Sequence, residues 1–295
     1  MQVGRMAAAG LALFGLFIFT AGGAAAQGKP GKQVRFPCGA GIAQNFQNLS
    51  GGFQKAGFRR ADVPAGNLQI QFIGHASFLV RSPSGVKVVT DYNDYYRADL
   101  VPDIVTMNIQ RGNHSADDIE PGITHVLRGW STDGGVQRHD VTFKDVRVYN
   151  LPTNLRNFGG GFTNFSSMFI IQSSGLCVAH MGHLAHLLDK EQFYRIGRID
   201  VLLVPVDGRV TLSYEELVHN IKGINPRVVV PMHFNVFSTL NEFLGEGAGP
   251  FPIKRIKGDT IQVSRSSLPQ KTEFWLMLPG QHGGGGFGGP GGSQL

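Results

Sequence analysis

The sequence of 295 residues has little cysteine and little charge. Its two cysteines, Cys38 and Cys177, are far apart, so neither has the close spacing of a cysteine-based metal site. Charged residues make up 16% of the chain, and the only basic cluster next to an aromatic is "GFRR" at 57 to 60. We therefore expect no nucleic-acid partner. The net charge of +6 suits a small anionic substrate or the anionic face of a membrane.

The two cysteines leave two possibilities open. Cys177 lies in the apolar run "GLCVAH", where a small buried thiol is the commoner state and the one we expect. A disulfide between Cys38 and Cys177 is the alternative in an oxidising compartment.

The sequence has one long apolar run at its N-terminus, "MAAAGLALFGLFIFTAGGAAA". It follows Arg5 and ends in small residues before Gln27, which is typical of a secretory signal peptide over residues 1–26. A transmembrane anchor is the alternative, but the apolar core is shorter than the roughly 20 residues that a spanning helix needs. We expect an exported protein, periplasmic or secreted, without a membrane anchor after signal removal.

The rest of the chain divides by composition into three parts. Residues 27–66 are rich in Gly, Gln and Asn and predict an irregular N-terminal arm, and residues 67–278 predict the folded domain. The glycine-rich residues 279–295 predict a flexible tail. The signal and the tail alone would also fit a membrane or cell-surface interaction protein, but the tail specifies no partner.

The central part predicts many short strands and two late helices. Alternating or apolar stretches such as "LQIQFIG", "DIVTMN", "IDVLLVPV" and "RVVVPMH" indicate strands, and "SSMFIIQSSGLCVAHMG" indicates a hairpin. "LLDKEQFYRIG" has helical spacing, and "SYEELVHNIKG" begins with the capping-box pair Ser213 and Glu216 and stops at Gly223. This order predicts an α/β fold in which two stacked sheets have helices outside, a four-layer αββα sandwich.

Polar residues collect where the predicted strands end. The segments are "GHAS", "TD", "GNHSADD", "AHMGHLAH", "PVDG" and "PMHF". Loops at one rim of a rigid scaffold are where binding and catalytic residues usually lie, so we expect these segments to converge on one site.

These segments resemble the metallo-β-lactamase superfamily, within it the branch of the ascorbate-phosphate lactonase-like proteins. The resemblance runs from about Leu68 to His233 through "IGHASFLV", "VKVVTD" and "VDGRVTLSYEELVHNIKGINPRVVVPMHF". It implies the αββα sandwich and a site for one or two metal ions that activate water. The family ligands are a His-x-His-x-Asp-His turn, a later His, an Asp and a final His.

This chain departs from that pattern at most of the ligand positions. The turn positions become Ile109, Arg111, Asn113 and His114, and the next family histidine falls near Leu155. His183 stands at the aspartate position of a later segment, and His233 matches the final ligand.

The resemblance therefore implies one divalent metal ion at His114, His183 and His233. Zinc is expected, with manganese or iron as alternatives, and a pocket without metal is also open because Arg111 can replace a cation's charge.

Four further residues are candidates for catalysis or for orienting the three metal ligands. Asn113 and Asp207 are the catalytic candidates, Asp207 as proton acceptor, although a turn-forming role before Gly208 is the simpler interpretation of Asp207. His75 and Asp91 are expected to orient the ligands rather than bind metal.

Arg111 and His180 are possible contacts for an anionic ligand. For His180 a hydrogen-bonded structural role is the alternative.

The sequence allows two functions, one as an enzyme and one as a binding protein. The first is an exported hydrolase with one metal ion that cleaves an ester, a lactone or a phosphoester. The second is an inactive relative that keeps the sandwich as a binding or scaffolding module, because four ligand positions are altered. Surviving ligand-capable side chains at three positions favour the hydrolase.

Overall fold

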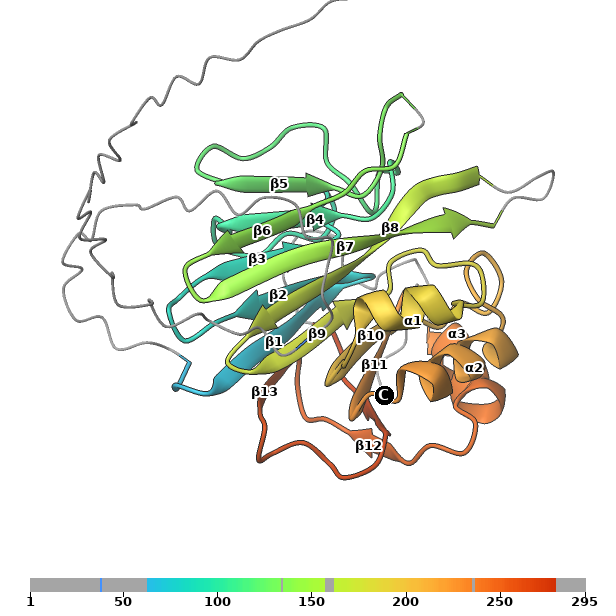
Figure 1. Ribbon diagram of the computed structural model, residues 1–295. Coiled ribbons are helices and arrows are strands. Elements are labelled where there is room, and N and C mark those ends of the chain that lie inside the picture. The colour runs from blue at the N-terminus through green and yellow to red at the C-terminus, as the bar shows by residue number, and fades with distance from the viewer. Residues whose placement is uncertain (1–37, 39–62, 134, 157–161, 235–236, 280–295) are drawn as a thin grey trace, which may run out of the picture. The chain divides into compact units, whose positions relative to one another are not determined.

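Two β-sheets form the core of the computed structural model, which describes residues 38, 63–133, 135–156, 162–234 and 237–279 (Figure 1). The six-stranded sheet has the order β13-β1-β2-β3-β4-β5 and the eight-stranded sheet the order β12-β14-β11-β10-β9-β8-β7-β6. The strands of the first sheet are β1 (Asn67–Gly74), β2 (Ser77–Arg81), β3 (Lys87–Thr90), β4 (Ile104–Met107), β5 (His125–Arg128) and β13 (Thr260–Ser264). Those of the second are β6 (Asp140–Phe143), β7 (Val146–Leu155), β8 (Phe162–Ser173), β9 (Leu176–His180), β10 (Val201–Pro205), β11 (Val228–Met232), β12 (Ile253–Arg255) and β14 (Glu273–Leu276).

The alternation of side chains along the strands separates the core into two apolar layers. Phe72 and Phe78 point to the inner face, where they join Phe169 of the other sheet in the main core. Their chain neighbours Ile73 and Leu79 point to the outer face of the six-stranded sheet and form a second cluster. Both layers follow from the period of two of a β-strand. The predicted pair of stacked sheets is confirmed.

The helices lie against the eight-stranded sheet (Figure 1). They are α1 (Lys190–Ile196), α2 (Tyr214–Ile224), α3 (Phe237–Glu242) and the π-helical turn η1 (Phe243–Gly247). The predicted capping box of α2 is confirmed, since Ser213 accepts from the N–H of Glu216. The helix ends one residue later than predicted because Asn225, not Gly223, takes the left-handed conformation that closes it.

The layer over the six-stranded sheet is irregular in the described part of the chain. Tyr96, Leu100, Ile119 and Ile123 pack on its outer cluster from segments without helix. Strand β12 was not predicted, because all three of its residues are exposed and it has no apolar alternation. β6, α3 and η1 were also not predicted.

The structure pairs Cys38 with Cys177 in a disulfide, with Cα atoms 6.0 Å apart. The expectation of a buried free thiol at Cys177 was therefore wrong. Sequence could not decide this, because the partners are 139 residues apart. The predicted signal peptide, most of the arm and nearly all of the tail lie outside the described residues. No helix in the described ranges combines the length and apolar character that crossing a membrane requires.

Candidate metal centre

The polar segments at the strand ends come together from both sheets. His75 lies in the turn between β1 and β2, and His114 lies in the turn after β4. His183 follows β9 and His233 follows β11, so the second sheet contributes the other two histidines. The backbone N–H of His233 donates to the carbonyl oxygen of His75 at 2.7 Å, which joins the two sheets at this point. The expected convergence is therefore present in the structure.

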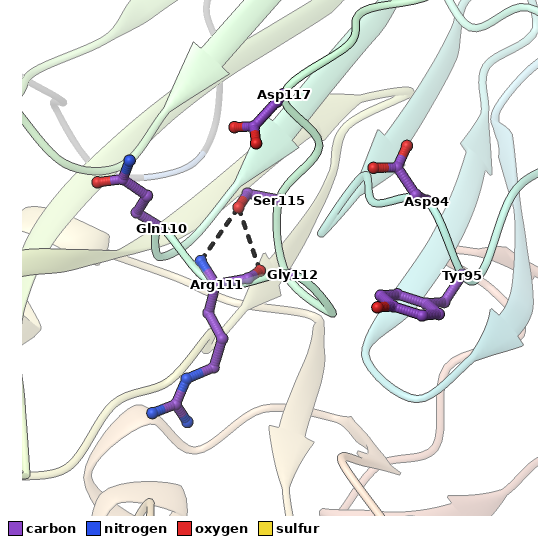
Figure 2. Close-up of a pocket in the computed structure, with 7 residues that line it drawn as sticks. All are labelled: Asp94, Tyr95, Gln110, Arg111, Gly112, Ser115 and Asp117. Atoms are coloured by element: carbon purple, nitrogen blue, oxygen red, sulfur yellow. Dashed lines mark hydrogen bonds between the residues drawn. The ribbon is translucent and has the colours of Figure 1, made fainter.

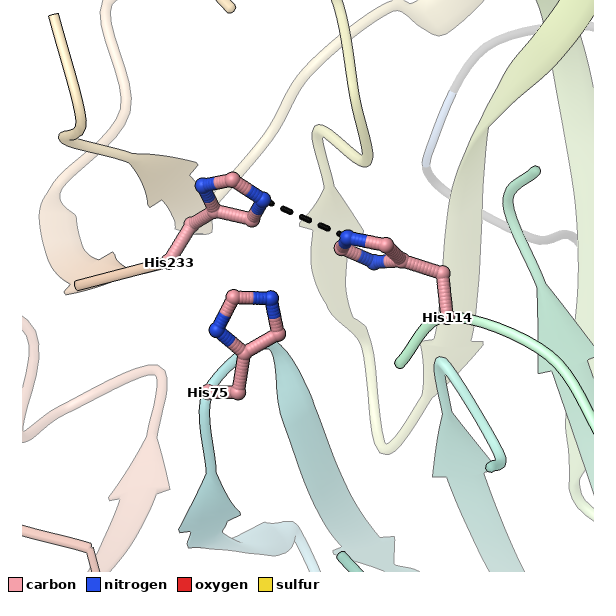
Figure 3. A group of neighbouring side chains, drawn as sticks. All are labelled: His75, His114 and His233. Carbon is pink, nitrogen blue, oxygen red and sulfur yellow. Dashed lines mark hydrogen bonds between the residues drawn. The ribbon is translucent and has the colours of Figure 1, made fainter. Parts of the chain in front are cut away.

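Three of these histidines form a compact group. The ligand atoms of His75, His114 and His233 lie within 4.8 Å of one another, and all three side chains are buried. Figure 3 shows their rings directed toward a common point. The Nε2 atoms of His114 and His233 are 3.3 Å apart. Two nitrogen ligands of a tetrahedral zinc ion, at about 2.0 to 2.1 Å each, would lie about 3.3 to 3.4 Å apart.

In each of the two facing histidines, a carboxylate lies beside Nδ1, the ring nitrogen that does not face the other histidine. Nδ1 of His114 lies 2.6 Å from Oδ2 of Asp91, and Nδ1 of His233 lies 3.1 Å from Oδ1 of Asp207. Where a carboxylate accepts the proton on Nδ1, Nε2 keeps a lone pair, and the hydrogen bond between His114 and Asp91 has this geometry. Two facing lone pairs repel each other unless a proton or a cation lies between them. This donor arrangement therefore fits a metal ion.

His183, one of the three predicted ligands, lies beside this group but is not among its ligand atoms within 4.8 Å of one another. Its ring centroid is 5.2 Å from that of His114 and 5.0 Å from that of His233, and its plane is nearly perpendicular to both. Both of its ring nitrogens are buried without a hydrogen-bond partner among the described residues. Burial, and then the charges of His233 and His114, lower the pKa of His183 to about 3. The ring is therefore neutral at physiological pH, the form that binds a metal.

His75 lies nearer to the other histidines than the sequence suggested. We expected it to orient a ligand, but its ring centroid is 4.4 Å from that of His233 and 5.0 Å from that of His114. This position makes His75 a candidate donor, and the orienting role stays a prediction that the geometry does not test. The available signal was the position of "GHAS" directly after a predicted strand, which the sequence alone did not distinguish from an ordinary turn.

Asn113 contacts His75 instead of an open catalytic position. Its Nδ2 atom lies 2.8 Å from Nε2 of His75. A half-turn of the amide would place Oδ1 there and let it accept the Nε2 proton. The geometry gives Asn113 a positioning role, where the sequence had suggested a direct part in catalysis.

Asp207 is held by its own loop. Its Oδ2 atom accepts hydrogen bonds from the N–H groups of Arg209, Val210 and Thr211, at 3.1, 2.7 and 3.2 Å. The Thr211 hydroxyl donates to Oδ1. Burial would raise the pKa of Asp207, but the hydrogen bond and charge of His233 and the bonds from Thr211 and Arg209 lower it overall. Asp207 is consequently a weak base, and the geometry favours turn formation and orientation of His233 over the predicted role of proton acceptor.

Asp91 is completely buried, in line with the orienting role that we expected for it. Its Oδ1 accepts the N–H of Asn108 at 3.2 Å, while Oδ2 faces His114. Burial raises the pKa of Asp91, but the charges of His114 and His180 and the two hydrogen bonds lower it overall. The carboxylate thus stays ionised beside His114.

His180 cannot reach a ligand. It is fully buried, its Nε2 lies 2.7 Å from the carbonyl oxygen of Ala76, and its Nδ1 accepts the N–H of Gly182 at 3.2 Å. Both ring nitrogens are therefore used within the protein. The suggested contact of His180 with an anion was wrong, and the hydrogen-bonded alternative holds.

Backbone strain is concentrated at this site. His75, Asp91 and His233 have φ values of 51°, 46° and 61°, in the left-handed region that non-glycine residues rarely adopt. Such residues persist where the surrounding structure holds them, commonly at functional sites.

Three residues stand at altered ligand positions of the resemblance, Ile109, Arg111 and Leu155. Ile109 is buried, Leu155 is half-buried at the end of β7, and Arg111 is exposed in the turn before His114. None of these three side chains is a metal ligand, so the histidines supply the nitrogen donors of the candidate centre.

A family model, two relatives and one solved structure are similar to this chain. A family model described as the β-lactamase superfamily domain matches residues 69–233. A protein of Pyrococcus abyssi named as a UPF0173 metal-dependent hydrolase is 25% identical over 228 residues, which cover 66% of this chain and 95% of that protein. A similarly named protein of Methanosarcina mazei is 24% identical and matches 60% of this chain and 87% of its own length.

A solved structure from Thermotoga maritima has the same fold. It superposes with a TM-score of 0.53 at 23% identity, over 71% of this chain and 98% of its own. It is described as a candidate zinc-dependent hydrolase of the metallo-β-lactamase superfamily.

Proposed function

The chain belongs to the β-lactamase superfamily, and from this we propose that it is a metal-dependent hydrolase whose metal ion lies between His114 and His233. The predicted resemblance to the metallo-β-lactamase superfamily is thereby confirmed. His75 and His183 are the flanking donors of the proposed site. A set of imidazole nitrogens suits zinc best, with manganese and iron as weaker candidates. The names of the relatives also support metal-dependent hydrolysis.

One observation carries this proposal. The Nε2 atoms of His114 and His233 face each other at 3.3 Å, and each ring has a carboxylate at its other nitrogen. Metal-binding histidines commonly have such carboxylate partners. The contact is a hydrogen bond when one Nε2 carries a proton; when both rings hold their proton on Nδ1, a cation between the two lone pairs is the stable arrangement.

The residues of the site have different roles in the proposed hydrolysis. A bound divalent metal would activate water and polarise the bond to be cleaved. Asp91 holds His114 through the hydrogen bond at Nδ1, and Asp207 places a second negative charge 3.1 Å from Nδ1 of His233. Asn113 holds His75 at the third corner. The proposed substrate is an ester, a lactone or a phosphoester.

We also propose that the mature protein is exported to the periplasm or secreted. The predicted signal peptide motivates this proposal. The disulfide between Cys38 and Cys177 supports it, because disulfides persist mainly in oxidising compartments.

Metal analysis of the purified full-length protein tests the proposed function. We expect about one metal ion per chain in the wild type after equilibration with zinc, and strongly reduced content in His114→Ala and His233→Ala. His219→Ala is the matched control, because His219 is exposed on α2. Circular dichroism checks that each variant is folded.

A wild-type protein that holds no stoichiometric zinc, manganese or iron would reject the proposal. So would equal metal content in His233→Ala and His219→Ala. Hydrolysis of 4-nitrophenyl acetate, a γ-lactone and bis(4-nitrophenyl) phosphate by the metal-loaded protein then distinguishes the substrate classes.

A further inference from the structure

Arg111 is a positively charged residue in the same turn as His114 of the histidine cluster. Its side chain is exposed, and it makes no ion pair with any residue in the described ranges. Seven other arginines in the described ranges form ion pairs with carboxylates. They are Arg97, Arg147, Arg156, Arg195, Arg198, Arg209 and Arg265.

The backbone of Arg111 is fixed to the same turn as His114. Its carbonyl oxygen accepts the N–H of His114 at 2.7 Å and the N–H of Ser115 at 2.9 Å. Its own N–H donates to the Ser115 hydroxyl oxygen at 3.1 Å, and that hydroxyl donates back to the Arg111 carbonyl (Figure 2). The backbone of Arg111 is therefore held in a defined position, three residues before the proposed metal donor His114.

The side chain points away from the nearby acidic residues. The turn borders a cavity of about 240 Å³ that is also lined by Asp94, Tyr95 and Asp117. In Figure 2 the guanidinium group of Arg111 extends to the side opposite the Asp94 and Asp117 carboxylates. Asp94 is itself paired with Arg97. The positive charge of Arg111 is thus not cancelled by this cavity.

Arg111 belongs to the same turn as His114, and its carbonyl oxygen accepts the N–H of that histidine. The donors of the proposed site are neutral imidazoles, and the carboxylates of Asp91 and Asp207 are already directed at His114 and His233. The exposed guanidinium of Arg111 is therefore the basic group of this turn that can attract a negatively charged ligand.

Building on the proposed function, we propose that Arg111 binds an oxyanion group of the substrate, a phosphate or a carboxylate, next to the metal position. A guanidinium group matches such groups with two parallel N–H donors. Arg111 is then a specificity residue that makes a phosphoester or another anionic ester the preferred substrate over a neutral ester.

Calorimetric titration with inorganic phosphate tests this binding role in both zinc-loaded and metal-free full-length protein. We expect Arg111→Gln to weaken phosphate binding roughly tenfold or more in the zinc-loaded form, which corresponds to the loss of a charge-assisted contact. Arg255→Gln is the matched control, because Arg255 is exposed on β12 and loses the same charge. Metal content is measured for each sample, so that a loss of metal is not mistaken for a loss of anion binding.

Kinetics provides the second measurement. Arg111→Gln is expected to lower kcat/KM for 4-nitrophenyl phosphate at least tenfold more than kcat/KM for 4-nitrophenyl acetate. Equal phosphate affinity in wild type and Arg111→Gln would overturn the inference, and so would the absence of phosphate binding by the wild type. If the protein binds no metal, the proposed function fails, but an Arg111-dependent affinity of the metal-free protein for phosphate would still support the anion site.

Discussion

The carboxylate of Asp91 lies 2.6 Å from Nδ1 of His114, and both side chains are almost completely buried. A buried carboxylate in this position determines which ring nitrogen carries the proton and where the ring points. The geometry of the proposed metal site thus depends on a residue that does not bind the metal itself.

Replacement of Asp91 by asparagine tests this dependence. Asp91→Asn keeps an oxygen acceptor and suits the left-handed backbone at this position, where φ is 46°. It removes the negative charge that stabilises the correctly oriented ring, so we expect zinc affinity to fall about 10- to 100-fold. Competition with a chromophoric chelator measures the affinity. Unchanged affinity in a folded Asp91→Asn protein would show that the pair has only a structural role.

Zinc binding should also stabilise the fold. A ligand that binds only the native state, at 100 times its Kd, adds about 2.7 kcal/mol to the free energy of unfolding. We expect the melting temperature of the wild type to rise when zinc is added to the metal-free protein. His233→Ala should show little of this rise, whereas His219→Ala should show all of it. Differential scanning fluorimetry at several zinc concentrations measures the shifts, and an identical rise in both variants would argue against this metal site.

Gly182 determines the path of the chain toward His183. Its φ is +61°, and a Cβ atom there would lie 2.0 Å from Nδ2 of Asn108 and 2.7 Å from the carbonyl oxygen of Ser167. Gly182→Ala should therefore destabilise the protein by several kcal/mol and lower the metal content.

The matched control for this substitution is Gly175→Ala. Gly175 has a φ of +73° with nothing within 4 Å of the added Cβ, so only backbone strain of about 1 kcal/mol is expected. Urea denaturation compares the two variants. Equal losses would show that the contacts with Asn108 and Ser167 do not matter.

The disulfide should contribute measurably to stability. It joins residues 139 positions apart, and the loop-closure model gives up to about 5 kcal/mol for a loop of that length. Cys38→Ser should lower the midpoint of denaturation under oxidising conditions. A reductant should produce a similar loss in the wild type and none in Cys38→Ser, and a wild type that is insensitive to reductant would contradict this expectation.

The sequence predicted the sheets well, because the alternation of apolar residues directly records which face of a strand is buried. Ile73 and Phe72 point to opposite layers, as their neighbouring positions require. It missed β12, whose three residues are all exposed, and it missed β6, a four-residue edge strand of which only Val141 and Phe143 pack on the main core. The capping box at Ser213 was predictable since all of its contacts are local.

Within the site, the sequence identified residues better than roles. His114, His183 and His233 were selected through the family resemblance, and the structure places them in one cluster. The place of His75 depends on a turn from one sheet meeting a strand end of the other, which no local pattern encodes. The role of Asp207 depends on the three N–H groups of its loop, which only the folded backbone brings to one carboxylate oxygen.

The hydrogen bond from the His233 N–H to the His75 carbonyl has a consequence for protein engineering. Because it is made by main-chain atoms, it does not depend on which side chains these two positions carry. Asparagine, which tolerates positive φ, could replace either histidine without removing this link between the sheets. The side chains at these two positions could therefore be replaced by other metal ligands, for example oxygen ligands for a harder metal ion. The main-chain hydrogen bond that joins the two sheets would stay the same.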